Sequence, residues 1–200
     1  MRPGGGSGTP LRVALLLHSY GARAGSLAAR DARHLARALR DAGHHPLIVC
    51  SHVGSFEKTA DERIPLLRVP RLPEAALHRR GFTGPLTGAP GALAALLGAR
   101  VDVAHAFSVP DALSARLWRR LTGRPALLTC SEPATREGVA DRRLRLSLLG
   151  RAVEQSDAVI APTEPSRAAL SRWLAVDAEL IDAQDARTHV QLYRDLLGVS

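Results

Sequence analysis

The stretch LRVALLLHSYGARAGSLAARDARHLARALRDAGHHPLIVCS, residues 11–51, decides the fold. Its first part, Leu11–Leu17, is a nearly continuous apolar run, which is typical of a parallel strand covered on both faces. Ser26 can cap a helix, and Gly43 can end it in a left-handed conformation. Between them apolar residues recur at helical spacing: Ala28, Ala32, Leu35, Leu39 and Ala42. A second apolar run, Pro46–Ser51, completes a strand–helix–strand unit, for which we expect a right-handed crossover.

The same alternation of strands and helices continues along the chain. Further strands are expected at Ile64–Val69, Val101–Phe107, Ala126–Cys130, Asp157–Ala161 and Ala178–Ile181. Further helices are expected at Leu93–Leu97, Asp111–Leu121, Arg142–Gln155, Pro165–Leu174 and Gln184–Leu197. The sequence therefore predicts an α/β fold, with a Rossmann-like, doubly wound, mostly parallel sheet in a single domain. Residues 1–10, which are rich in Gly, Ser and Pro, are expected to be a disordered lead.

Composition narrows the classes of partner. The 200 residues suffice for one domain and carry a formal net charge of +8. Only Lys58 among the 27 basic residues is a lysine, so we attribute the arginine excess to coding bias in a GC-rich genome. Acidic residues are interleaved with the arginines, and we expect no nucleic-acid partner. Apolar runs such as Val13–Leu17 are too short for a membrane span or a secretion signal, so we expect a cytoplasmic protein with at most peripheral membrane association.

Several kinds of site are excluded by missing motifs. Cys50 and Cys130 are the only cysteines and form no Cys-x-x-Cys pair, so no disulfide framework or cysteine zinc site is expected. The chain contains no His-Glu-x-x-His helix, no P-loop and no Gly-x-Ser-x-Gly elbow. The loop Gly21–Gly25 lacks the spacing of a dinucleotide fingerprint. We therefore expect no metal site and no cofactor.

Ligands of doubly wound sheets bind at the carboxyl ends of the strands. That rule places the site among five loops: His18–Gly25, Ser51–Gly54, Phe107–Asp111, Cys130–Pro133 and Pro162–Glu164. A separate long loop, Pro70–Gly91, holds several prolines and glycines and the cluster His78-Arg79-Arg80. Two interpretations of this loop stay open, a solvated excursion or a segment that binds an acceptor or a membrane surface.

Four segments, taken in order, resemble the family-4 glycosyltransferases of the GT-B fold. The first is the opening strand and helix, with LARAL at Leu35–Leu39 followed by Gly43-His44. The others are VDVAHAFS at Val101–Ser108, GRPALLTCSE at Gly123–Glu132 and SDAVIAPTEPSRAAL at Ser156–Leu170. We identify residues 11–182 as similar to the N-terminal domain of this family, which is one half of a GT-B architecture.

The resemblance implies transfer of a hexosyl group from a nucleotide-sugar to an acceptor, with retention of configuration. The nucleotide-sugar would be a substrate, and neither metal nor cofactor is implied. Acceptor or substrate contacts are implied for Gly21, Gly25, His105, Ser131 and Glu132, and no catalytic residue is assigned. From the residues alone, His105 is equally well explained as a buried structural histidine, and Glu132 as a solvated carboxylate.

The sequence also departs from the family pattern. The family's glycine pair falls on Ser26 and Leu27, and a family histidine is replaced by Ser131, which cannot carry a proton at neutral pH. The family's second domain, with two glutamates separated by seven residues, has no counterpart here. Residues 183–200 instead resemble the family's final helix, which we expect to be amphipathic and to pack back on the domain.

These departures lead to two functional hypotheses. In the first, the chain is the acceptor-binding half of a glycosyltransferase and is inactive alone. It would take a sugar or lipid-linked acceptor and would need a separate donor-binding subunit or form a homodimer. In the second, the chain is a non-catalytic binding or scaffold module, or a truncated remnant of an enzyme.

Overall fold

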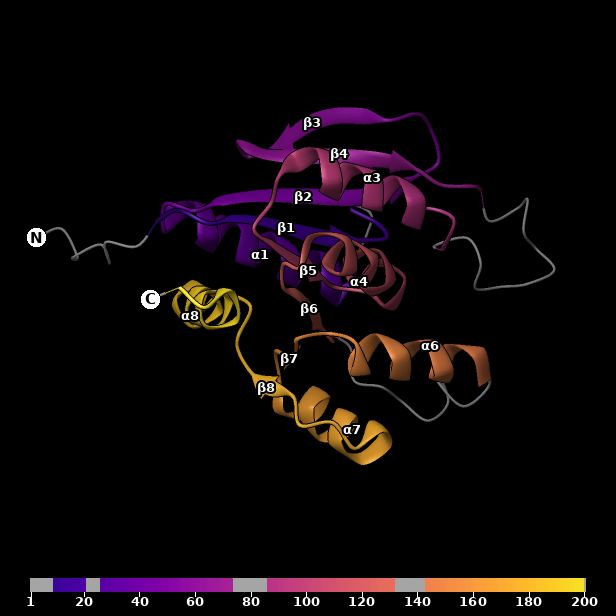
Figure 1. Ribbon diagram of the computed structural model, residues 1–200, viewed down its shortest axis with the longest axis vertical. Coiled ribbons are helices and arrows are strands. Elements are labelled where there is room, and N and C mark those ends of the chain that lie inside the picture. The colour runs from indigo at the N-terminus through magenta and orange to yellow at the C-terminus, as the bar shows by residue number, and fades with distance from the viewer. Residues whose placement is uncertain (1–8, 21–25, 74–85, 132–142, 200) are drawn as a thin grey trace, which may run out of the picture.

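A twisted eight-stranded sheet runs through the whole molecule (Figure 1). The computed structural model describes residues 9–20, 26–73, 86–131 and 143–199. Along the sheet the strand order is β3-β4-β2-β1-β5-β6-β7-β8, and only the β3–β4 pair is antiparallel. Because the chain winds outward from β1 in both directions, the α/β, doubly wound, mostly parallel architecture expected from the sequence is confirmed.

The strands match the apolar runs of the sequence closely. Their bounds are β1 Arg12–Leu17, β2 His45–His52, β3 Glu57–Asp61, β4 Ile64–Pro70, β5 Val103–Ala106, β6 Ala126–Thr129, β7 Ala158–Ala161 and β8 Glu179–Leu180. Register places Leu15 of β1 between Ile48 of β2 and His105 of β5. The central strands are buried on both faces, which explains why their sequences are apolar throughout rather than alternating.

Helices cover both faces of the sheet. Their bounds are α1 Leu27–Asp41, α3 Ala89–Ala99, α4 Val109–Thr122, α6 Arg143–Glu154, α7 Glu164–Leu174 and α8 Ala186–Leu197. One face is covered by α3, α4, α6 and α7, around the buried Trp118 and Leu128. The other is covered by α1 and α8, around Leu35 and Tyr193. Thus the last helix of the chain returns to the same face as the first (Figure 1).

Side-chain caps explain where most helices begin. The hydroxyls of Ser26, Ser108 and Thr163 accept hydrogen bonds from backbone amides three residues later, and the Asp185 carboxylate does the same for α8. Helix α4 ends at Gly123, whose φ of 71° is the left-handed conformation that glycine tolerates best. Local sequence therefore fixes the ends of the elements that position the strand-to-helix loops.

The structure differs from the sequence-based expectation at β3. This strand was not predicted, because its residues, EKTAD, form no apolar run. It pairs antiparallel with β4 at the edge of the sheet, through a turn in which Glu62 and Arg63 adopt positive φ angles of 48° and 67°. The helix expected at Leu93–Leu97 is also longer and begins at Ala89, within the stretch interpreted as a loop. Residues 1–8 of the expected lead lie outside the described part of the chain.

Candidate functional site

The order of the strands reverses between β1 and β5, so the carboxyl ends of these two strands mark the expected binding edge. The residues His18–Tyr20 follow β1, and Ser108 follows β5 at the start of α4. Next along the same edge come Ser131 after β6 and Thr163 after β7. Two of these hydroxyls, those of Ser108 and Thr163, already cap their own helices, and Ser131 is buried. The described part of the edge is therefore polar, with its hydroxyls largely engaged by the protein itself.

Asp111 is a buried carboxyl group at this switch point, and the sequence analysis did not single it out. Its side chain accepts a hydrogen bond from the Ser108 hydroxyl, and its backbone amide donates to the Ser108 oxygen over 3.4 Å. Burial raises the pKa of Asp111 to about 7, against the opposing effect of the Ser108 hydrogen bond. The Ser-x-x-Asp spacing directly after a buried strand is a capping-box signal that could have identified it.

His105 lies inside β5 rather than at its end, and its side chain is fully buried. Its Nδ1 atom is 2.7 Å from the Tyr193 hydroxyl, and its Nε2 atom is 2.6 Å from the Thr129 hydroxyl (one nitrogen donates and the other accepts). The imidazole also stacks on Phe107, with ring centroids 4.7 Å apart. Both ring nitrogens are thus occupied by protein groups, which favours the structural interpretation of His105, and a direct acceptor contact stays a prediction.

A second buried histidine, His189 of α8, lies beside His105 with ring centroids 5.6 Å apart. Among the described residues neither of its ring nitrogens has a well-aligned hydrogen-bond partner, and the Asp182 carbonyl acts only as a weak acceptor. Burial lowers the pKa of His189 to about 4, although the Asp182 carbonyl and the Asp185 and Asp182 charges act in the opposite direction. Burial first, and the neighbouring His189 second, also lower the pKa of His105 well below its usual value. Both imidazoles are therefore neutral at pH 7.

The remaining predicted site residues fall in two groups. Ser131 is described and buried, its hydroxyl has no hydrogen-bond partner among the described residues, and its carbonyl accepts from the Ser166 hydroxyl at 3.5 Å. Gly21, Gly25 and Glu132 lie outside the described residues. The structure places Ser131 after β6, next to the start of α7, and the acceptor contacts of all four residues stay predictions.

The two cysteines do not add a nucleophile to this edge. Burial raises the pKa of the Cys50 thiol to about 11 and that of Cys130 to about 12, so both are protonated at neutral pH. Within the described ranges, no three His, Cys, Asp or Glu side chains come together to hold a metal ion. The chemistry available at the described part of the edge is therefore hydrogen bonding and the titration of Asp111.

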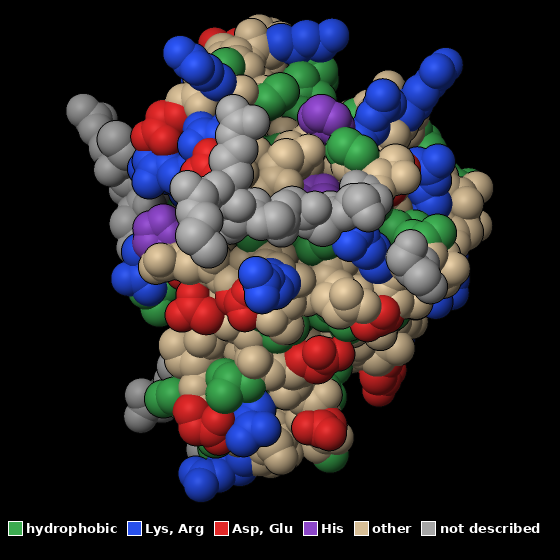
Figure 2. Space-filling model, turned by 90° about the vertical axis from the view of Figure 1, so that its left-hand side faces the viewer, with side chains coloured by type: hydrophobic (Ala, Val, Ile, Leu, Met, Phe, Trp, Pro, Cys, Tyr) green, Lys and Arg blue, Asp and Glu red, His purple; other side chains and the backbone are tan. Residues whose placement is uncertain are grey.

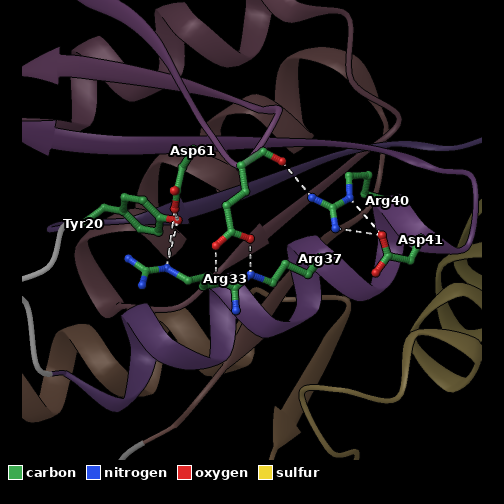
Figure 3. A network of polar contacts seen from close by, with 7 residues as sticks. Tyr20, Arg33, Arg37, Arg40, Asp41 and Asp61 are labelled. Atoms are coloured by element: carbon green, nitrogen blue, oxygen red, sulfur yellow. Dashed lines mark hydrogen bonds and ion pairs between the residues drawn. The ribbon is translucent and has the colours of Figure 1, made fainter.

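A polar network fixes the chain where it leaves β1 (Figure 3). The Tyr20 hydroxyl donates to Asp61 at the end of β3 and accepts from Arg33 Nε of α1 over 3.2 Å. The Arg33 guanidinium also lies 5.0 Å from the centre of the Tyr20 ring. Further along α1, Arg37 forms a two-pronged ion pair with Glu62 in the β3–β4 turn. The unpredicted hairpin is thus attached to α1 and to the start of the glycine-containing loop.

Positively and negatively charged side chains are interspersed on the face of the molecule that Figure 2 shows, which faces left in Figure 1. Several of the described arginines are paired with acids, among them Arg119 with Asp157 at 2.5 Å and Arg167 with Glu164 at 3.0 Å. No helix in the described part of the chain has the length and apolar character needed to cross a membrane.

Residues 28–183 match the glycosyl transferase 4-like domain, and the chain belongs to that family. The sheet and its flanking helices correspond to a Rossmann-like half of the GT-B architecture. A comparison with curated proteins finds no match.

Solved structures show the same fold at low sequence identity. A portion of sucrose-phosphate synthase from Thermosynechococcus elongatus matches with a TM-score of 0.65 and 19% identity, over 93% of this chain and 99% of that portion. HepE from Anabaena, in complex with UDP and glucose, matches with a TM-score of 0.60 and 15% identity, over 94% of this chain. This chain covers 50% of HepE and 47% of a longer sucrose-phosphate synthase structure, so it spans about half the length of these glycosyltransferases.

Proposed function

We propose that this chain supplies the acceptor-binding half of a retaining glycosyltransferase and does not transfer sugar alone. The observation that carries the proposal is the match of nearly the whole chain to half of HepE, a protein seen with UDP and glucose. A family match over residues 28–183 supports the same assignment. The nucleotide-sugar would be bound by a partner, such as a separate donor-binding subunit, and would be a substrate rather than a cofactor.

Within that proposal, the acceptor lies at the carboxyl ends of β1, β5 and β6. Hydroxyl groups of a sugar or a lipid-linked acceptor would meet Ser131 and the carboxyl of Asp111, together with Gly21, Gly25 and Glu132 of the flanking loops. With its pKa raised to about 7, Asp111 can accept a hydrogen bond from an acceptor hydroxyl or donate one to it near neutral pH. His105 would act indirectly, by holding the ends of β5 and β6 against α8.

The test is a pair of assays on the purified 200-residue chain. We expect no sugar transfer and no hydrolysis with UDP-glucose or other common nucleotide-sugars, and no binding of UDP by calorimetry. A complete glycosyltransferase of the same fold serves as the positive control. Measurable transfer or stoichiometric UDP binding by this chain would contradict the proposal, because it would require a donor site within these residues.

A scaffold role is the second candidate, and one observation favours it. Large hydrophobic side chains are exposed at the carboxyl ends of β2 and β4, namely Val53, Phe56 and Leu72. Exposed apolar groups of this kind mark contact surfaces when they gather at one edge. A scaffold or homodimer predicts a molecular mass by light scattering that rises with concentration. A strict monomer that still binds a sugar acceptor would instead support the first proposal. For either role we expect the protein in the cytoplasm.

A further inference from the structure

The face formed by α4 and α6 carries three arginines without an acidic partner. Arg116 and Arg120 are one turn apart on α4, and Arg151 lies near the end of α6, which contacts α4. None of the three has a hydrogen bond or ion pair within the described part of the chain, and the buried Nε of Arg116 is unsatisfied. Burial first, and then the charges of Arg120 and Arg151, lower the pKa of Arg116. Like charges are therefore gathered here rather than neutralised.

This arrangement contrasts with the arginines of α1. Arg33, Arg37 and Arg40 of α1 each have an acid within 3.5 Å, and Arg119 on the adjacent side of α4 is bound to Asp157. Coding bias raises the number of arginines everywhere, and Arg172, Arg187 and Arg194 also have no ion pair among the described residues. Arg116, Arg120 and Arg151 differ from them because they lie close enough for their charges to act on one another. The unpaired cluster is thus a local feature and calls for an anionic partner.

Leucines are exposed directly beside the cluster. Leu117 and Leu121, each one residue after an arginine of the cluster, are 46% and 66% exposed, and Leu97 of α3 is 47% exposed. Helices α3 and α4 contact each other, and between their ends lies a hollow of about 340 Å³ lined by Leu96, Leu97 and Trp118 among others. The surface therefore carries apolar side chains toward α3 and unpaired positive charge toward α6.

We propose that this α3–α4–α6 face binds the surface of an anionic lipid bilayer. Leucines at the level of the acyl boundary and arginines at the level of the phosphates are the combination that such an interface accommodates. Arginine side chains can extend their charged ends toward phosphates while their aliphatic stems lie on apolar surface. A nucleic acid would complement the positive charge of the arginines but would make no use of the exposed leucines. An acidic protein would need a surface shaped to fit the two adjoining helices.

The proposed surface is separate from the binding edge. Helices α3, α4 and α6 lie on one face of the sheet, whereas the acceptor is expected at the carboxyl ends of the strands (Figure 1). The chain could therefore lie on a bilayer and leave that edge open. The inference does not depend on the proposed function, because lipid binding is measured without any sugar transfer.

The test is co-sedimentation of the full chain with vesicles. We expect binding to vesicles of equal parts phosphatidylcholine and phosphatidylglycerol, and little binding to phosphatidylcholine alone. The triple variant Arg116→Gln, Arg120→Gln, Arg151→Gln should bind the anionic vesicles about a hundredfold more weakly. Raising the salt concentration should weaken binding of the unaltered chain, because exposed charges are screened. The double variant Leu117→Gln, Leu121→Gln should also bind more weakly while keeping its charge.

A matched control removes the same charge elsewhere. Arg12, Arg63 and Arg187 are exposed and lie on β1, in the β3–β4 turn and on α8. Their triple substitution by glutamine should leave vesicle binding within about twofold of the original. Equal losses in the two triple variants would show that only net charge matters and would overturn the proposal. Absence of binding to anionic vesicles, or stronger binding to duplex DNA than to vesicles, would overturn it as well. Circular dichroism of each variant confirms that the fold is retained.

Discussion

The helices on the two faces of the sheet bury different kinds of side chain. On the α3, α4, α6 and α7 face, the buried cluster consists of apolar side chains, with Trp118 as the largest. On the α1 and α8 face, the apolar cluster includes Tyr193 and encloses two neutral histidines and the Thr129 hydroxyl. The first face also buries hydroxyl groups, such as those of Ser114 and Ser166, which donate to backbone carbonyls, whereas on the second face buried side chains bond to one another.

This difference explains what determines the position of α8 on the sheet. An apolar helix can slide along an apolar face at modest cost, but the bond between Tyr193 and His105 specifies one position for α8. The cost of this arrangement is the unpaired imidazole of His189, which is buried in the same contact. The position of α8 on the polar face is therefore specified by hydrogen bonds as well as by apolar packing.

The largest expected effect comes from truncating one large side chain on each face. Tyr193→Ala and Trp118→Ala should each lower the free energy of unfolding by about 4 kcal/mol, measured in urea. Hydrogen exchange should separate them, because Tyr193→Ala releases mainly α8, while Trp118→Ala weakens the whole domain. If α8 kept its protection from exchange in Tyr193→Ala, the central role given to this contact would be wrong.

Removing the imidazole that joins the strands to α8 should have the next largest effect. His105→Leu fills similar space but leaves the Tyr193 and Thr129 hydroxyls without their partner. We expect a loss of about 3 kcal/mol in unfolding free energy. The control is His189→Leu, which removes an imidazole with no well-aligned hydrogen bond among the described residues and should be neutral or stabilising. Equal destabilisation by both substitutions would contradict the distinction drawn between the two histidines.

The pH dependence of stability should reveal the opposite titrations of the two faces. His189 has a folded-state pKa of about 4, below its usual value, so the unfolded chain binds the extra proton and stability falls as the pH drops from 6.5 toward 4. His105 acts in the same direction. The pKa of Asp111 is raised to about 7, so the folded chain binds the extra proton and stability falls as the pH rises from 4 toward 7.

Single variants isolate these contributions. Each group changes the unfolding free energy by about 1.4 kcal/mol per pH unit within its own window. Between pH 4 and 6.5, Asp111→Asn should therefore make the rise of stability with pH steeper, and His189→Leu should make it flatter. Urea melts at several pH values measure these slopes. A slope unchanged in both variants would mean that neither group has the shifted pKa described above.

The smallest expected effect concerns the surface network of α1. Arg37→Gln removes the ion pair with Glu62, in which both side chains are substantially exposed. Pairs of this kind contribute less than about 1 kcal/mol, and the contribution decreases with salt. The melting temperature in low and high salt measures it. A loss as large as that of His105→Leu would show that the β3–β4 hairpin depends on this pair far more than its exposure indicates.

Much of the fold could be predicted from the sequence because its signals are local. Apolar runs such as Leu11–Leu17, and caps such as Ser26, depend on near neighbours and appear where expected. Strand β3 could not be predicted, because it forms by pairing with β4, and its neighbours Arg37 and Tyr20 lie far from it in the sequence.

The site was less predictable than the fold. His105 stood out in the sequence, but its partner Tyr193 is 88 residues further along the chain, and no local pattern indicates that contact. Ser131 was predicted to lie at the binding edge, and the structure does place it after β6, beside the start of α7. Asp111 was missed although its capping box is visible in the sequence, because a cap alone does not indicate a buried carboxyl group.

The return of α8 to the first face also affects how the domain forms during synthesis. Strands β1, β2 and β5 and helix α1 leave the ribosome well before residues 186–197, at a typical rate of about 5–20 residues per second. Until then the part of that face that α1 does not cover, around His105, lies against water. The nascent chain therefore exposes this part of its core for several seconds, and a chaperone can bind it until α8 covers it.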